Sequence, residues 1–500
     1  MKELAPFFPM NMFRDLLTAS QHRMSSVDTS WLRMDSPHNL MMITGVIVFD
    51  TPVDRERLKQ TVENRFLKFK RFRQRPVQAP AMAYWEKDPN FDIDHHVCAV
   101  VLPGKAGKAA LQDFVSDLAA VPLEADRPLW RFHLIERFGK GSAMVVRIHH
   151  CYADGIALIA VMHSLTTTTS DEVDVPLKPE REEEEPGLFE QLLAPATQAY
   201  IKSVKLSGKL MVGYLNLLTH PAKAMDLTRQ GVEITQEAAA LLATPTDTKT
   251  RFKGIPGIVK RVAWAEPLPL DEVKAVGKAL GCSVNDVLLS CVAGALRDYL
   301  VEKGDNVDGV EIRAMVPVNL RSPKDAEKLG NHFGLVALVL PVGVGNPLKR
   351  LYEVRRRMQA LKGSYQPMLA YGLLAAVGMA PKMVQDLLLG SMSAKATAVM
   401  TNVPGPSEKL YLAGARIEQQ MFWVPQSGNI GMGVSILSYG GGVQFGLMTD
   451  KGLVPDPEKI IDRFGAEFEK LLLLTLMEPW DEQRDPEEVE ASLLMQRQAE

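Results

Sequence analysis

The stretch HHCYADG, residues 149–155, carries the most information about the fold of this chain. It follows an alternating apolar run that predicts a buried strand, and it precedes an apolar run that predicts the start of a helix. Two imidazoles, His149 and His150, therefore stand where a strand ends and the chain turns. An imidazole titrates near neutral pH and can take a proton from a hydroxyl group in one step. The pattern indicates a positioned base, with Asp154 just before the helix and Gly155 at the tight bend.

Each polar residue of this stretch also has a plainer interpretation. Paired histidines can form half of a metal site, but zinc requires three or four ligands, and no cysteine or acidic ligand lies at metal spacing nearby. Asp154 can cap the helix N-terminus through its carboxylate, and His149 can be a core residue held by one hydrogen bond. A second pair, His95 and His96, lacks the Asp-Gly turn and is interpreted as ordinary strand residues. We therefore predict no metal site.

Composition bounds the class of protein. A chain of 500 residues, 46% hydrophobic and 23% charged, is typical of a globular protein with two or three domains. The net charge of −3 does not favour a nucleic-acid partner, and four cysteines without a Cys-x-x-Cys pair suit a reducing cytosol. The N-terminus lacks the apolar core of a signal peptide, and the longest apolar run, 368–380, is too short to span a bilayer. The sequence predicts a cytoplasmic protein that is soluble, or peripheral on the inner face of the membrane or on lipid inclusions.

Strand-like and helix-like patterns alternate in both halves of the chain. In the first half, the expected strands are 40–49, 131–137 and 142–148, the last two as a hairpin, and the expected helices are 53–69 and 112–120. In the second half, the expected strands are 258–265, 312–318, 333–342, 396–401, 432–437 and 443–448, and the expected helices are 284–300 and 457–474. Because both halves mix strands and helices in the same way, the sequence predicts two similarly built domains with a cleft between them.

Three segments rich in charge have less specific interpretations. The basic run at 65–75 is interpreted as a solvated helix end and edge strand rather than a phosphate site. The acidic, proline-containing segment at 171–186 predicts a solvated linker. The region 188–242 is helix-like, and a basic amphipathic helix within it can dock on a bilayer or pack on its own protein. The sequence leaves both alternatives open. The lysines that flank its apolar face are Lys202, Lys205 and Lys209.

The motif His-His-x-x-x-Asp-Gly resembles the signature of the CoA-dependent acyltransferase superfamily. That superfamily includes chloramphenicol acetyltransferase-like enzymes and peptide-synthetase condensation domains. Five further segments resemble the wax ester synthase/diacylglycerol acyltransferase family in particular. They are PLW at 128–130, SVNDV at 283–287, VPVNLR at 316–321, GNHFG at 330–334 and TNVPGP at 401–406. The resemblance extends in order from about Met24 to Phe468.

This resemblance implies an α/β fold with mixed sheets and helices. It implies two chloramphenicol-acetyltransferase-like domains with the active site in a tunnel between them. The implied divisions are an N-terminal extension at 1–21, an N-terminal acyltransferase domain with the histidine motif at 22–170, an acidic linker and helical connector at 171–254, a C-terminal acyltransferase domain at 255–476 and an acidic tail at 477–500.

The resemblance also implies transfer of a long-chain fatty acyl group from acyl-CoA to an alcohol. The acceptor is a long-chain fatty alcohol, which gives a wax ester, or diacylglycerol, which gives triacylglycerol. His150 matches the family's general base, and His149 is expected to support it. Asn285 is our candidate for the donor that stabilises the oxyanion, with a structural helix cap as the alternative. Asp154 is expected to pair with Arg321 and, together with Gly155, to hold the loop in shape.

Pro128, Leu129 and Trp130 are candidates to line the substrate tunnel, with a place in the core as the alternative. The chain has no Gly-x-Ser-x-Gly nucleophile elbow, which favours direct transfer in a ternary complex over a serine acyl-enzyme. We expect acyl-CoA as co-substrate, no other cofactor and no nucleic-acid partner. One rival function is a condensation-type acyltransferase that uses a carrier-protein thioester, which the lack of a flanking carrier segment disfavours. The other is a non-catalytic lipid-body-associated protein, which the intact histidine motif disfavours.

Overall fold

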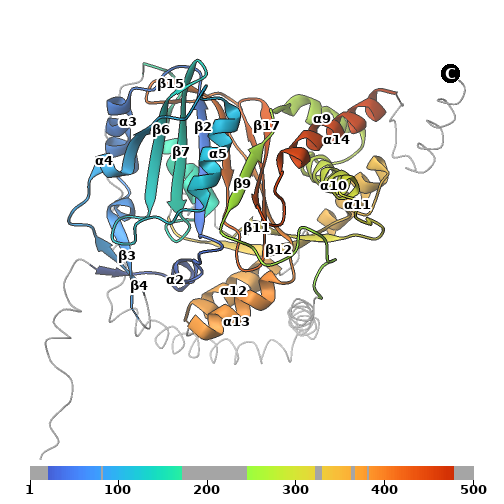
Figure 1. Cartoon of the computed structure of the whole chain (residues 1–500), viewed down its shortest axis with the longest axis horizontal. Helices are drawn as coiled ribbons and strands as arrows, with labels where there is room; N and C mark the ends of the chain where they lie inside the picture. Colours follow the sequence, from blue (N-terminus) through green and yellow to red (C-terminus); the bar gives the residue numbers. More distant parts are fainter. Residues whose placement is uncertain are drawn as a thin grey trace, which may run out of the picture.

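The computed structural model describes residues 21–79, 83–171, 245–320, 329–361, 366–379 and 382–477. Within these residues, the strands form two seven-stranded sheets and one three-stranded sheet. Figure 1 shows the two large sheets next to each other, the first on the left and the second on the right, with helices on their outer faces. The mixed α/β architecture predicted from the sequence is confirmed.

The first large sheet carries the histidine motif. Its strand order is β5 (Val97–Val100), β6 (Trp130–Phe138), β7 (Gly141–His149), β2 (Met42–Phe49), β15 (Ala415–Trp423), β14 (Tyr411–Leu412) and β8 (Thr166–Thr167). β6 and β7 form the predicted antiparallel hairpin. Every residue of β7 is buried, and alternate side chains enter two different hydrophobic clusters. Burial on both faces explains why this strand is mostly apolar in sequence.

Two strands from the C-terminal half complete the first sheet. β15 pairs with β2 in antiparallel fashion, with Phe422 opposite Gly45 and Met421 opposite Val46. A Cβ atom at Gly45 would overlap the ring of Phe422, so glycine permits this close approach. The sequence-based division into 22–170 and 255–476 therefore does not separate the two sheets, because residues 411–423 belong to the first one.

The second large sheet is mixed. Its order is β10 (Leu268–Pro269), β17 (Gly442–Asp450), β16 (Met432–Tyr439), β13 (Ala398–Pro404), β11 (Ile312–Asn319) and β12 (Phe333–Leu340), and β9 (Lys260–Trp264) also pairs with β17. β13 is parallel to both β11 and β16, and the other pairs are antiparallel. One face is covered by α9 (Leu270–Ala279), α10 (Val284–Glu302), α11 (Pro347–Leu361) and α14 (Glu458–Met477), which enclose the largest hydrophobic cluster.

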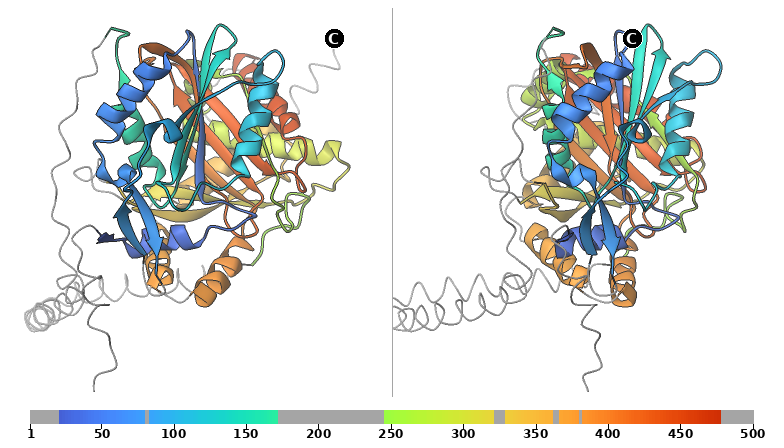
Figure 2. Two further views of the ribbon diagram at one scale, coloured as in Figure 1. Left: turned by 60° about the vertical axis from the view of Figure 1, so that its left-hand side comes forward. Right: turned by 90° about the vertical axis from the view of Figure 1, so that its left-hand side faces the viewer.

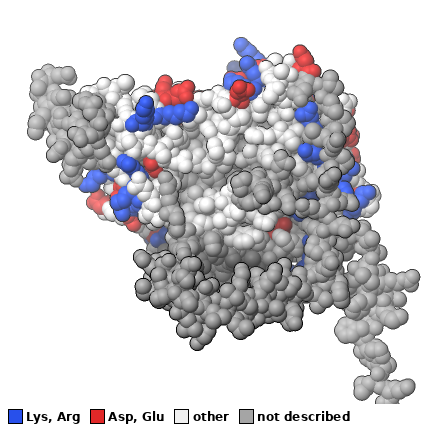
Figure 3. Space-filling view, turned by 180° about the vertical axis from the view of Figure 1, so that it is seen from behind, with Lys and Arg blue, Asp and Glu red and all other residues white. Residues whose placement is uncertain are grey.

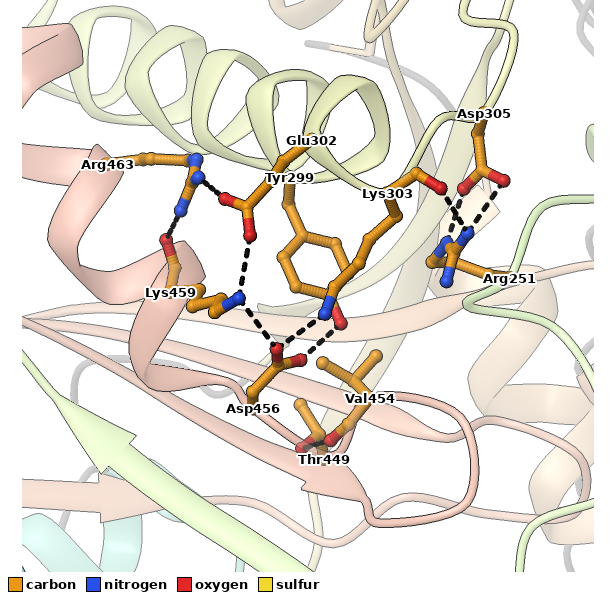
Figure 4. Close-up of polar contacts among 10 residues, drawn as sticks. All are labelled: Arg251, Tyr299, Glu302, Lys303, Asp305, Thr449, Val454, Asp456, Lys459 and Arg463. Carbon is orange, nitrogen blue, oxygen red and sulfur yellow. Dashed lines mark hydrogen bonds and ion pairs between the residues drawn. The ribbon is translucent and has the colours of Figure 1, made fainter.

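Polar contacts fix the C-terminal end of α10 (Figure 4). Asp456, just before α14, accepts hydrogen bonds from the hydroxyl of Tyr299 and from the ammonium of Lys303, both at 2.6 Å. Lys459 on α14 donates to Glu302 at 2.7 Å. Because α10 is anchored here and packed along its length, the position of its first turn at the opposite end is also determined.

A hydrophobic junction joins the two large sheets. α5 (Lys108–Ala119) packs against β9, and Figure 2 shows this helix beside the strands of both halves. The hydroxyl of Ser116 accepts a hydrogen bond from the backbone of Val262 at 2.9 Å. Trp264 of β9 and Trp423 of β15 belong to the same buried cluster. The two halves therefore share one continuous core along this line.

A smaller layer closes one end of the molecule. The three-stranded sheet is β1 (Gln21–Arg23), β4 (Ala83–Lys87) and β3 (Gln74–Gln78), and α2 (Ser26–Arg33) packs against α12 (Gln366–Met379). The Ser30 hydroxyl donates to the Leu374 carbonyl at 2.9 Å, and Gln385 of α13 (Lys382–Ser393) donates to the Ser30 carbonyl at 3.1 Å. Within the described residues no single helix is long and apolar enough to cross a membrane, and α9 with α10, bent by 98°, passes by length and composition only as a pair.

Several local expectations change in the structure. The helix expected at 53–69 is α3 (Arg55–Thr61) followed by a π-helical turn at Val62–Phe66. The strand interpretation of His95 and His96 is wrong, because both lie in the short helix α4 (Ile93–His96). The turn expected after residue 401 is instead the end of β13. Residues 172–244, with the helical connector and its three lysines, and the acidic tail from 478 lie outside the described residues.

Candidate active site

The histidine motif forms the predicted connection between a strand and a helix. β7 ends at His149, and α6 (Gly155–Ser164) begins at Gly155. Asp154 is the N-cap of α6, and its Oδ1 accepts a hydrogen bond from the backbone of Ala157 at 2.9 Å. The capping role considered for Asp154 is confirmed. The backbone N–H of His150 donates to the carbonyl of Met41 at 2.7 Å, which fixes the loop to the start of β2.

A segment from the C-terminal half binds this loop directly. The Asp154 N–H donates to the Gly330 carbonyl at 3.2 Å, and the His332 N–H donates to Asp154 Oδ2 at 2.9 Å. Between them, the Asn331 side chain donates to the His150 carbonyl at 2.9 Å. Gly330 has φ of +106°, a conformation that residues with a side chain rarely adopt. We name residues 330–332 the clamp segment, because its three residues hold both ends of the loop.

The middle residue of the clamp segment also contacts a charged pair of which the carboxylate is buried. Asn331 also donates through its side chain, at 2.8 Å, and its backbone, at 3.1 Å, to the carboxylate of Asp28 on α2. Arg71 lies 3.8 Å from that carboxylate and donates to the Tyr152 carbonyl at 3.1 Å. Burial raises the pKa of Asp28, and the Arg71 charge opposes that rise. The interpretation of the 65–75 run as solvated is therefore wrong for Arg71, which supports the loop. The expected partner of Asp154, Arg321, lies outside the described residues, so that pairing stays a prediction.

The His150 imidazole is enclosed by aromatic rings. Its centroid lies 4.2 Å from that of Trp31, with the planes 15° apart, and 5.7 Å from that of Phe333. Only 3% of the residue is exposed, and its Nδ1 atom is buried. Desolvation lowers the pKa of His150 to about 4, although the nearby Asp154 carboxylate acts in the opposite direction. The ring is therefore neutral at physiological pH, and its unprotonated nitrogen can accept a proton.

The His149 ring contacts the backbone of the loop and lies near a carboxylate. Its Nδ1 accepts a hydrogen bond from the Cys151 backbone at 3.2 Å, and its Nε2 lies 3.7 Å from the Asp35 carboxylate. The ring does not belong to the wall of the cavity that His150 faces. The structure thus gives the two histidines of the motif different surroundings.

An apolar cavity lies beside His150, between the two large sheets. The first sheet contributes Ile43, Val146 and Phe422, and the second contributes Met315, Leu335 and Ile436. α6 adds a further apolar wall. The polar side chains around the cavity are few, and they are those of His150, Asp154, Asn319, Thr401, Asn402, Ser427 and Ser435. A largely apolar space that ends at a neutral imidazole suits an aliphatic chain carrying a reactive hydroxyl group.

Asn285 lies one side chain away from this cavity. It is exposed in the first turn of α10, and its Oδ1 accepts a hydrogen bond at 2.9 Å from Asn402, which lines the cavity. The capping alternative for Asn285 is wrong, because Ser283 is the N-cap of α10 and forms a reciprocal capping box with Asp286. Asn402 was missed at the level of sequence, although it belongs to the quoted segment TNVPGP.

Pro128, Leu129 and Trp130 are buried and do not line the cavity. The Trp130 indole N–H donates to the Phe72 carbonyl at 2.8 Å, and its ring stacks on His96 at 4.3 Å. The Leu129 carbonyl accepts the His149 N–H at 2.9 Å. These residues occupy the core beneath the motif, as in the alternative considered for them.

Metal ligands do not cluster in the part of the chain that the structure describes, where no group of three or more His, Cys, Asp or Glu side chains could hold an ion.

Family models cover most of the chain. Residues 24–288 match the wax ester synthase/diacylglycerol acyltransferase catalytic domain, and residues 329–472 match the WS/DGAT C-terminal domain. A probable diacylglycerol O-acyltransferase of Mycobacterium tuberculosis is 26% identical over 446 residues, which cover 87% of this chain and 92% of the relative. A second, putative diacylglycerol O-acyltransferase of the same species is 27% identical over 472 residues, which cover 90% of this chain and 97% of the relative.

Solved structures share the fold. The wax ester synthase/diacylglycerol acyltransferase from Marinobacter aquaeolei VT8 superposes with a TM-score of 0.65 at 20% identity, covering 91% of this chain and all (100%) of that one. The first condensation domain of the calcium-dependent antibiotic synthetase gives a TM-score of 0.57 at 14% identity, covering 92% and 97%. The expected two-part acyltransferase fold is thus confirmed.

The Asp28–Asn331 contact can be tested by a double-mutant cycle. Asp28→Ala and Asn331→Ala should each lower the free energy of unfolding by about 1–3 kcal/mol, because each leaves buried polar groups unpaired. The double variant should cost less than the sum of the two, and turnover should fall in parallel. Urea denaturation measures the free energy of unfolding. The control is Asp271→Ala, which removes one member of the exposed Asp271–Lys274 ion pair and should cost under about 1 kcal/mol. Strict additivity would show that the two residues do not interact.

The lowered pKa of His150 predicts the pH profile. The folded-state pKa of His150 is about 4 and its unfolded value is about 6.5. Its contribution to the free energy of unfolding is therefore fully present above pH 6.5 and is lost as the pH falls toward 4. His96 and His133, with pKa values lowered by burial to about 4 and about 3, contribute in the same direction. Activity is therefore the specific readout. The acid limb of kcat/KM should lie near pH 4, and Trp31→Ala, which admits water, should move it toward 6.5. A wild-type limb near 6.5 would contradict the buried neutral base.

Proposed function

Because the chain belongs to the wax ester synthase/diacylglycerol acyltransferase family, we propose that it transfers a long-chain acyl group from acyl-CoA to a lipid hydroxyl, with His150 as the general base. The acceptor is a long-chain fatty alcohol or diacylglycerol. The observation that carries the mechanism is the neutral, buried imidazole of His150 at the wall of an apolar cavity between two sheets.

The reaction is a direct transfer between the two substrates. As the acceptor oxygen attacks the thioester carbonyl carbon, Nε2 of His150 takes the hydroxyl proton. The tetrahedral intermediate then collapses, the carbon–sulfur bond breaks, and the imidazolium returns the proton to the leaving thiolate. The products are the ester and free CoA. The Asp154 carboxylate favours the transient imidazolium, since its charge raises the pKa of His150 against desolvation.

Asn285 and Asn402 are our candidates for the oxyanion donors. Asn402 lies in the cavity wall and is oriented by its hydrogen bond to Asn285. A preorganised donor of this kind contributes about 10²–10³ in kcat in comparable sites. Asn285 then either donates a hydrogen bond to the oxyanion itself or holds the Asn402 amide in position to do so.

The apolar walls support lipid substrates over small polar ones. They exclude water, which would otherwise hydrolyse the thioester. A carrier-protein thioester is the second candidate donor, because condensation domains share the fold. A panel of acceptors is assayed with palmitoyl-CoA and, in parallel, with a carrier-bound palmitoyl thioester, and the products are identified by mass spectrometry. This comparison separates the two donors. Turnover only with a carrier-bound thioester would refute the proposed donor.

His150→Ala should lower kcat by about 10²- to 10⁴-fold, because the proton-abstracting group is lost. The fold and acyl-CoA binding should be retained, as checked by thermal unfolding and equilibrium binding. His149→Ala is the matched control within the motif and should reduce kcat less. If the two variants exchanged rank, the base would be His149.

Peripheral attachment to the cytoplasmic membrane face or to lipid inclusions is also part of the proposal, since both acceptors partition into lipid. The loop before β9 supports it, because Ile255 is 86% exposed and Ile258 and Val259 are each 51% exposed. The Lys451 N–H donates to the Val259 carbonyl of this loop at 3.0 Å. The neighbouring Asp450 N–H donates to the carbonyl of Gly431, which follows Ile430 of the cavity wall. Figure 3 shows one face of the molecule, on which the Lys, Arg, Asp and Glu side chains of the described residues lie mostly toward the margins.

Liposome flotation tests the attachment with two variants. Serine at Ile255, Ile258 and Val259 should weaken binding by loss of apolar burial. Glutamate at Lys202, Lys205 and Lys209 should release the protein from anionic lipid at low salt, because each charge contributes about 1 kcal/mol near the surface. Circular dichroism checks that both variants fold. Equal flotation of wild type and both variants would contradict attachment through either segment.

A further inference from the structure

A row of three residues crosses the wall of the apolar cavity on the first sheet. Val146 of β7 lies opposite Gly45 of β2, and Gly45 lies opposite Phe422 of β15. Val146 and Phe422 line the cavity, whereas Gly45 between them does not. The Phe422 ring accounts for this difference, because a Cβ atom on Gly45 would overlap its Cδ1 and Cε1 atoms. The ring therefore covers the glycine and forms the cavity wall at this row.

This row lies away from the reacting groups. His150 follows Val146 by four residues, which span at most about 14 Å. Between them lies a second row of the cavity wall, in which Ile148 of β7 pairs with Ile43 of β2. All members of the two rows are apolar, and such walls favour an apolar ligand group. In the proposed reaction, the group in contact with the Phe422 ring is therefore part of a hydrocarbon chain.

Contacts around Phe422 leave the cavity as the direction in which its ring can move. Gly45 lies under the ring, and the Ser435 hydroxyl of β16 donates a hydrogen bond to the Phe422 carbonyl. The residues on either side, Met421 and Trp423, are buried in the hydrophobic junction and do not line the cavity. The backbone of β15 is thus fixed between two strands. A side chain at position 45 would raise the ring into the cavity rather than displace the strand.

We propose that Gly45 and Phe422 set the length of the hydrocarbon chain that the active site accepts, because the absence of a side chain at position 45 lets the ring rest against the sheet. The proposal rests on the proposed acyl transfer to a lipid hydroxyl. The chain in contact with the ring is that of the acyl donor or that of the alcohol, and the two have the same chemistry. A purely structural role, in which the ring only shields the backbone around the glycine, predicts instead an equal loss of activity at every chain length.

Two series of substrates test the proposal. The first varies the donor from octanoyl-CoA to stearoyl-CoA with hexadecanol as the acceptor, and the second varies the acceptor from octanol to octadecanol with palmitoyl-CoA as the donor. Gly45→Ala should shorten the preferred chain in one series, because the raised ring excludes methylene groups. Each excluded methylene should lower kcat/KM for the long substrates about fourfold, the effect of leaving one CH₂ group in water. Turnover of the shortest substrate in that series should be retained.

Phe422→Leu is the reciprocal variant. It removes ring volume from the cavity wall and should shift the same series toward longer chains. It also relieves the overlap with a side chain at position 45. The double variant Gly45→Ala/Phe422→Leu should therefore regain the activity on long substrates that Gly45→Ala loses. Thermal unfolding checks that each variant folds, and Phe422→Leu alone tests the proposal if Gly45→Ala does not.

The matched control is Gly446→Ala on β17, which also adds a methyl group beside β15. Its Cβ would lie 3.0 Å from Trp423 and 3.1 Å from Met421, within the hydrophobic junction and outside the cavity wall. It should lower the free energy of unfolding without changing the preferred chain length in either series.

An equal loss at every chain length in Gly45→Ala, or an unchanged profile in Phe422→Leu, would overturn the proposal. A shift in the first series assigns the contact to the acyl chain, and a shift in the second assigns it to the alcohol. Failure of the wild-type protein to esterify any of these alcohols with any of these donors would instead refute the proposed function, so the two failures are distinguishable.

Discussion

The carboxamide of Asn331 joins three parts of the chain that are remote in sequence. It donates to the Asp28 carboxylate on α2 and to the His150 carbonyl in the catalytic loop, and its own backbone belongs to the clamp segment before β12. All three residues are at most 3% exposed. Removing one member of this network would leave the buried groups that it now pairs unsatisfied. The shape of the catalytic loop therefore depends on contacts made by both halves of the molecule.

The same network determines the surroundings of the base. α2 carries Asp28 and, one turn later, Trp31, whose ring stacks on His150. Enclosure by Trp31 and Phe333 removes water and keeps the imidazole neutral. A base with a pKa of about 4 has a weak thermodynamic tendency to take a proton from an alcohol. In the proposed mechanism, proton transfer therefore accompanies attack on the thioester, and the Asp154 carboxylate, held by the Ala157 and His332 amides, stabilises the positive charge that develops.

The exchange of strands between the halves explains the cavity. β15 crosses into the first sheet next to β2, so its Phe422 faces the same space as Met315 and Ile436 of the second sheet. The hydrophobic junction around Trp264 and Trp423 prevents the two sheets from separating along that edge. The walls of the cavity are the inner faces of strands, so the cavity is apolar. Burial of the same faces stabilises the sheets.

Local pattern by itself determined the strand–loop–helix unit of the histidine motif, most strand positions and the mixed α/β class. The alternation in β6 and β7 and the capping of α6 by Asp154 depend on neighbouring residues, so periodicity and residue type suffice to predict them. The family resemblance added the order of the motifs and the proposed role of His150 as the base. Only the tertiary structure decided that Asn331 and Arg71 support the loop, that Trp130 lies in the core, and that β15 joins the first sheet. These features depend on contacts between residues far apart in the chain, such as Phe422 with Gly45, and burial on that scale has no local signature in the sequence.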